Sequence, residues 1–131
     1  MSTGGLEGLN IGSISSMVFD TNNIPYALIP YVTGEDTNYI VVKYIDNAWI
    51  RIGEAFTGYI SMDNLILDAN NVPYVNKDSY NQETDTHTST IMKFDGNTWI
   101  QLGDEISNIP NGVRLFIDKA NTPYTMINMD T

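Results

Sequence analysis

The stretch Asp68-Ala69-Asn70-Asn71-Val72-Pro73-Tyr74 decides the fold, because versions of it occur at three places in the chain. Asp20-Thr21-Asn22-Asn23-Ile24-Pro25-Tyr26 begins 48 residues earlier, and Asp118-Lys119-Ala120-Asn121-Thr122-Pro123-Tyr124 begins 50 residues later. A short apolar run precedes each copy, so each predicts a strand that enters a tight turn. The proline is tolerated where the next strand starts. A spacing of this size indicates a repeat architecture.

A second motif keeps the same period. Trp49-Ile50-Arg51-Ile52-Gly53 and Trp99-Ile100-Gln101-Leu102-Gly103 lie 50 residues apart, and Asp95-Gly96 precedes the later copy. Asp-Gly is a strong signal of a hairpin because the turn needs positive φ. The repeating unit therefore has four strands. In the later unit we expect them at about 59–67, 72–77, 89–94 and 98–102, with a long polar connection over 78–87.

Composition sets the fold class and removes several kinds of partner. The 131 residues are rich in Val, Ile, Tyr, Thr and Asn, which favours an all-β fold, and the 42% hydrophobic share is enough for one packed domain. A formal charge of −10 disfavours nucleic acid and anionic membrane surfaces as partners. The absence of cysteine excludes disulfides, thiolate metal sites and cysteine nucleophiles.

The sequence leaves the compartment open. Its first residues contain no basic segment followed by an apolar stretch, and no window has the roughly 18 apolar residues of a membrane helix. We expect a cytoplasmic protein or a segment excised from a larger secreted one.

The repeat resembles a known family. Four-stranded antiparallel units of about 40 to 50 residues are typical of β-propeller blades. The pattern D-x-N-N-x-P-Y followed by N-x-W-I-x-[IL]-G resembles the blades of bacterial β-propeller repeat proteins and, more loosely, those of tachylectin-type propeller lectins. The resemblance implies a single propeller-repeat domain over 1–131. Its blades would span about 9–53 and 59–103, with a half blade at about 112–131.

The number of blades implies assembly. Propellers typically have about four to eight blades, and this chain has two and a half. We therefore expect several copies to form a homo-oligomer that completes a ring, with the half blade as the joint. Head-to-tail growth into a fibre is the rival outcome, because a heterologous contact that does not close makes filaments.

The Asp-turns and the repeated aromatic residues favour structural roles. Asp68-x-Asn70 opens like a calcium-binding EF-hand loop, but the sixth position is Pro73 and the twelfth is Ser79. Asp and Asn side chains commonly bond their own backbone in turns, so we expect no metal site. The repeated Tyr and Trp residues could stack on sugars, but packing between units is favoured.

No catalytic arrangement stands out. His87 is the only histidine, and no local spacing orders it with a serine and an aspartate. Adjacent acids such as Glu35-Asp36 point apart on a strand and do not make a glycosidase pair. We expect no enzyme, no catalytic residue and no cofactor.

Loop placement suggests a binding face. Alternating strands place the Asp-turns at one end of the units and the longer, more variable polar connections at the other, and recognition usually lies on such loops. The candidate ligand-binding residues are Asp36, Asn38, Tyr59, Tyr80, Asp85 and His87. The leading hypothesis is a non-enzymatic, lectin-like module that recognises glycans. The alternative is a structural, self-assembling protein without a small ligand.

Overall fold

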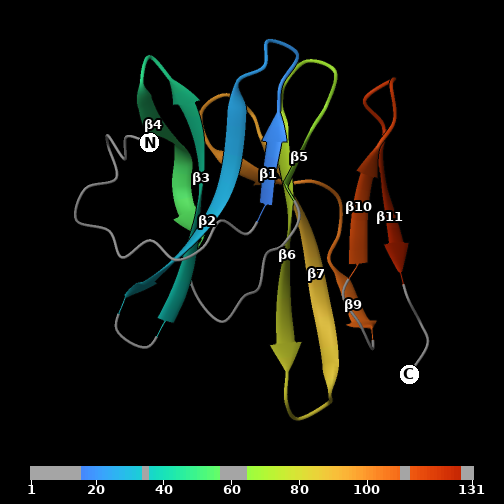
Figure 1. The fold of residues 1–131 in the computed structure, drawn as a ribbon. Helices are drawn as coiled ribbons and strands as arrows, with labels where there is room; N and C mark the ends of the chain where they lie inside the picture. Colours follow the sequence, from blue (N-terminus) through green and yellow to red (C-terminus); the bar gives the residue numbers. More distant parts are fainter. Residues whose placement is uncertain (1–15, 34–35, 57–64, 110–112, 128–131) are drawn as a thin grey trace.

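The chain is seen in a computed structural model, which describes residues 16–33, 36–56, 65–109 and 113–127. All regular elements in these ranges are strands, and they form three antiparallel sheets that follow the repeat (Figure 1). None of the sheets closes on itself. The described chain is therefore all-β, as the composition predicts.

The first two sheets have the same strand order. The first sheet pairs β1 (Ser16–Phe19), β2 (Pro25–Thr33), β3 (Asp36–Ile45) and β4 (Ala48–Phe56) in sequence order. The second pairs β5 (Leu65–Leu67), β6 (Pro73–Asn81), β7 (Thr86–Phe94) and β8 (Trp99–Gln101), and β9 (Ile106–Ile109) also pairs with β7. The third sheet contains β10 (Val113–Ile117) and β11 (Pro123–Ile127).

The expected connection over 78–87 is wrong. Strand β6 runs to Asn81 and β7 begins at Thr86, so only four residues join them. The polar side chains here gave no apolar alternation, but the backbone ladder continues from Asp78↔Ser89 to Asn81↔Thr86. Backbone pairing does not require apolar side chains, because every residue supplies its own N–H and C=O. The segment after Gly103 likewise contains β9, which the sequence did not predict.

Each Asp-turn is held by its own aspartate. Asp68 Oδ1 accepts the backbone N–H groups of Asn70 and Val72 at 2.8 and 3.0 Å, and Asn71 N–H donates to Asp68 C=O. Asn71 has a φ of 64°, a left-handed conformation that Asn tolerates better than most residues. The turns at Asp20 and Asp118 repeat these bonds. This is the structural role that the sequence favours.

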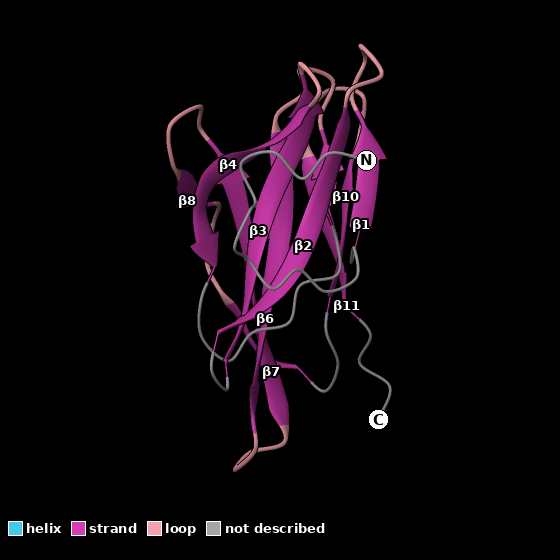
Figure 2. Cartoon of the chain, turned by 60° about the vertical axis from the view of Figure 1, so that its left-hand side comes forward, coloured by secondary structure: helices cyan, strands magenta, loops and turns pink. Residues whose placement is uncertain are grey.

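The turns lie at one end of the molecule. The β1–β2, β5–β6 and β10–β11 turns stand in a row at the top of Figure 1, while the β6–β7 hairpin extends at the opposite end, as Figure 2 also shows. Strand β5 contacts both β1 and β10. The two-ended arrangement expected from alternating strands is therefore present.

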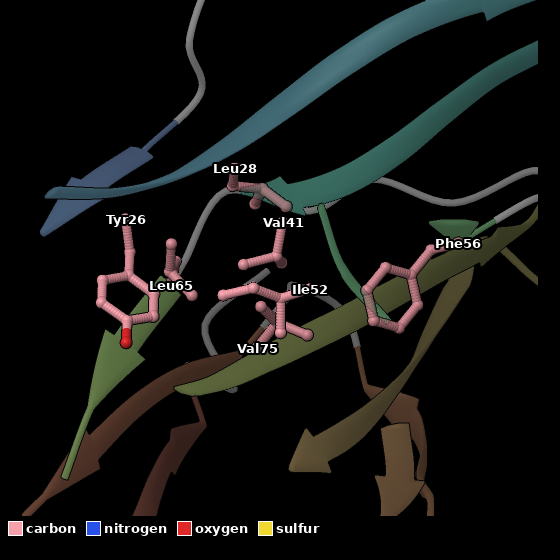
Figure 3. Close-up of a cluster of buried hydrophobic side chains, with 7 residues drawn as sticks. All are labelled: Tyr26, Leu28, Val41, Ile52, Phe56, Leu65 and Val75. Atoms are coloured by element: carbon pink, nitrogen blue, oxygen red, sulfur yellow. The ribbon is translucent and has the colours of Figure 1, made fainter. Parts of the chain in front are cut away.

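A shared apolar core joins the first two sheets. Side chains from β2, β3 and β4 meet side chains from β5 and β6, and all are buried (Figure 3). This cluster contains Tyr26, Leu28, Val41, Ile52, Phe56, Leu65 and Val75. Trp99 packs against it, with ring centroids 5.2 Å from Phe56 and 5.3 Å from Phe94. Its Nε1–H donates to Ile52 C=O at 3.0 Å, so Trp99 serves packing between the sheets.

A second core joins the second and third sheets. Tyr74, Ile91, Ile109, Val113 and Leu115 are buried together there. Trp49 is also buried, but with Tyr44 on the opposite face of the first sheet. The two repeated tryptophans therefore occupy matching positions in different surroundings.

Candidate functional site

The structure brings together three of the six predicted ligand-binding residues. Tyr80, Asp85 and His87 lie at the end of the β6–β7 hairpin. Asn38 lies in β3 of the first sheet and is 5% exposed. Asp36 begins β3, where its backbone pairs with Thr33. Tyr59 falls outside the described residues.

The centre of the hairpin site is the ring of Tyr80, which is 49% exposed. Tyr80 stands directly across the strand pair from His87, and their ring centroids are 5.0 Å apart at an interplanar angle of 48°. The Tyr80 hydroxyl donates to Asp85 Oδ1 at 2.5 Å. This hydrogen bond is the main cause that raises the pKa of Tyr80 above its ordinary value. The contacts hold an aromatic ring in place while leaving about half of it open to solvent.

Asp78 holds His87 in place, although no pattern in the sequence pointed to it. Its Oδ2 lies 2.8 Å from His87 Nδ1, and its Oδ1 accepts the Ser89 hydroxyl at 3.0 Å. Asp78 is buried. It sits two residues before Tyr80 on β6, as Ser89 sits two residues after His87 on β7, so all four share one face. Asp78 would have been found if both predicted strands had been extended into the polar segment, because every second residue of a strand lies on the same face.

The hairpin site has the features of a polar recognition surface. Ser89 is bonded to Asp78 rather than to the imidazole, so these three groups do not follow the Ser–His–Asp order of a triad. Within the described residues, Asp85 Oδ2 and His87 Nε2 have no hydrogen-bond partner. The hairpin end therefore offers an aromatic face beside open polar atoms.

A groove between the first and second sheets is the other candidate. It measures about 680 Å³, and its walls include Tyr26, Lys43, Ile52, Val72, Phe94 and Ile100. Arg51 and Lys93 also line it, but strand alternation directs their side chains to the opposite faces of their sheets. Lys93 Nζ lies 5.7 Å from the ring centroid of Tyr74. Only Lys43 shares the inward face with Tyr26, so the groove does not gather its cations around one point.

The described ranges contain no group of three or more His, Asp or Glu placed to hold a metal ion. They also contain no helix long and apolar enough to cross a membrane.

Comparisons with protein-family models, with curated proteins and with solved structures find no match to this chain.

Proposed function

We propose that this protein is a non-enzymatic, lectin-like module that recognises glycans through the end of the β6–β7 hairpin. The observation that carries the proposal is the half-exposed Tyr80 ring, held by His87 and Asp85 over the buried Asp78. An aromatic ring can lie against the apolar face of a sugar. The open oxygen of Asp85 can accept a hydrogen bond from a sugar hydroxyl.

The proposal includes the architecture around the site. The sheets are blades of a β-propeller, and several copies of the chain complete the ring. The order of four consecutive strands that the first two sheets share, the core between neighbouring sheets and the row of Asp-turns support it. A ring would repeat the hairpin site once in each copy, and several weak sites held together bind more strongly than one.

A glycan array probed with the intact protein tests the proposal. Wild-type protein retains a specific set of sugars, and Tyr80→Ala weakens that binding about tenfold, the effect of losing an aromatic contact worth about 1.4 kcal/mol. Ile50→Ala is the matched control, because Ile50 is exposed to a similar degree on β4, outside the hairpin. Equal loss in both variants, or binding to no sugar, contradicts the proposal.

The second candidate is a structural protein that assembles with itself and has no small ligand. Exposed apolar side chains on the two outermost sheets, Phe19 on β1 and Met126 on β11, favour it. The absence of sugar binding on the array, together with large particles in the electron microscope, supports this alternative.

A further inference from the structure

Neighbouring Asp-turns are linked by a repeated hydrogen bond. The turns are named here turn 1 (20–24), turn 2 (68–72) and turn 3 (118–122). Thr21 N–H in turn 1 donates to Asn71 Oδ1 in turn 2 at 3.0 Å. Ala69 N–H in turn 2 donates to Asn121 Oδ1 in turn 3 at 2.8 Å. In both cases the second residue of one turn donates to the left-handed asparagine of the next turn.

One donor and one acceptor of this series remain unused. In the part of the chain that the structure describes, Lys119 N–H has no acceptor and the Asn23 carboxamide has no partner, although both occupy the same turn positions as the bonded groups. Turn 1 and turn 3 stand at opposite ends of the row, with turn 2 between them (Figure 1). Asn23 and Lys119 therefore cannot complete the series within one molecule.

The apolar contacts between sheets follow the same direction. Val18 and Tyr26 of the first sheet pack with Leu65 and Leu67 of the second. At the matching positions one unit later, Ile66 and Tyr74 of the second sheet pack with Leu115 and Ile117 of the third. One face of each unit therefore meets the opposite face of the next unit.

Exposed apolar side chains remain at both ends of this series, although the rest of the first sheet's outer face, around Ala27 and Trp49, is buried. The tail face is defined as Phe116, Tyr124 and Met126 of the third sheet, which share one side of the β10–β11 pair. Tyr124 is 54% exposed, whereas Tyr74 at the matching position is 2% exposed. The head face is defined as Met17 and Phe19 of the first sheet, which match Leu65 and Leu67. Phe19 is 62% exposed.

We propose that the tail face of one copy docks on the head face of a second copy, with Lys119 N–H donating to Asn23 Oδ1 of that copy. The partner is a second copy, because this chain carries both the unused donor and the unused acceptor. The two end faces also match the interface that occurs twice within the chain, between the first and second sheets and between the second and third. A tail-to-tail pair would put donor against donor and leave both asparagines unused, so the contact is heterologous. This inference names the partner surface of the proposed ring, and it does not rest on glycan binding.

Two pairs of variants test the contact on the full chain. Phe19→Asp disables the head face and Met126→Asp disables the tail face, because each places an unpaired carboxylate in an apolar contact. Asn23→Gly removes the acceptor while keeping positive φ accessible. Lys119→Pro removes the donor at the second turn position, which suits proline. Ile100→Asp on β8 is the control, because Ile100 is exposed but belongs to neither end face.

The readout is particle mass by light scattering across a concentration series, compared with the 14.6 kDa of one chain. Wild type and Ile100→Asp form particles larger than one chain. Phe19→Asp and Met126→Asp each weaken association at least about 30-fold, and Asn23→Gly and Lys119→Pro each weaken it about fivefold. Circular dichroism shows that the variants remain folded.

Mixing the two aspartate variants gives the decisive result. Each retains one intact face, so the mixture forms a one-to-one pair and grows no further. A wild-type protein that stays at the mass of one chain overturns the inference. So does a mixture that stays monomeric while wild type assembles. The monomeric variants keep the β6–β7 hairpin, so their retention of sugars on an array tests the proposed function separately.

Discussion

The side chain of Asn71 accepts a hydrogen bond from the backbone N–H of Thr21, which lies one repeat earlier in the chain, and its Nδ2 donates to Thr21 Oγ1 at 2.9 Å. The same residue has a φ of 64° and ends the second Asp-turn. Asn71 thus serves its own turn through its backbone and joins two sheets through its side chain.

These two roles of Asn71 can be separated by substitution. Asn71→Gly keeps the left-handed backbone and removes the two contacts to Thr21, so the free energy of unfolding falls by about 1–2 kcal/mol. Asn71→Ala removes the same contacts and adds a left-handed non-glycine residue, which costs about 1–2 kcal/mol more. Urea unfolding of both variants measures the difference. Equal stability of the two would contradict the backbone role.

The repeat supplies a matched test of the contact between Gly53 and Trp99. Both Gly53 and Gly103 have a φ near +75°, but a Cβ on Gly53 would lie 2.7 Å from Trp99 Cδ1, whereas a Cβ on Gly103 meets nothing within 4 Å. Gly103→Ala therefore lowers the free energy of unfolding by about 1–2 kcal/mol through backbone strain alone.

Gly53→Ala adds the displacement of Trp99 and the loss of its hydrogen bond to Ile52, for a total of at least about 3 kcal/mol. Thermal unfolding followed by tryptophan fluorescence measures the loss of stability in both variants. A loss in Gly53→Ala no larger than that in Gly103→Ala would show that Trp99 is not confined there.

The Asp-turns differ in burial, and their substitutions should differ in the same way. Asp68 is buried and accepts two backbone N–H groups and the Tyr74 hydroxyl. Asp68→Ala leaves these donors without a partner and lowers the free energy of unfolding by about 2–4 kcal/mol. Asp118 makes the same bonds but is exposed, so water replaces them and Asp118→Ala has a smaller effect. Denaturant unfolding compares the two variants, and a reversed order would refute the argument.

Acid should weaken the turn at Asp118. Hydrogen bonds, first the one from Thr122 N–H, hold the pKa of Asp118 below its ordinary value of 3.8. Because the folded state has the lower pKa, the stabilisation is present above pH 3.8 and is lost as the pH falls below it toward the folded pKa.

Asp118→Asn removes this titration, so stability in that acidic range depends less steeply on pH than it does in wild type. Thermal unfolding followed by circular dichroism across the acidic range measures the slope. An unchanged slope would show that Asp118 does not titrate as described.

The sequence by itself determined the repeat, the all-β class and the turns, because these depend on local chemistry. Aspartate bonds its own turn, asparagine tolerates positive φ, and proline marks a strand start. Apolar runs predicted strands at about 59–67 and 89–94, and the described parts of these ranges, 65–67 and 89–94, are strand. The same local signals failed over 78–87, where polar side chains concealed a continuous ladder.

Only the tertiary structure decided which matching residues share the same role. Tyr74 is buried because the third sheet covers it, whereas Tyr124 in the same motif has no described sheet beyond it. Trp99 donates a hydrogen bond to Ile52 of the first sheet, while Trp49 packs with Tyr44 on the far side of that sheet. Asp78 contacts His87 because the register between β6 and β7 places both on one face. A repeated sequence specifies identical turns, but burial and contact depend on which neighbour each copy meets, and that is a property of packing between units.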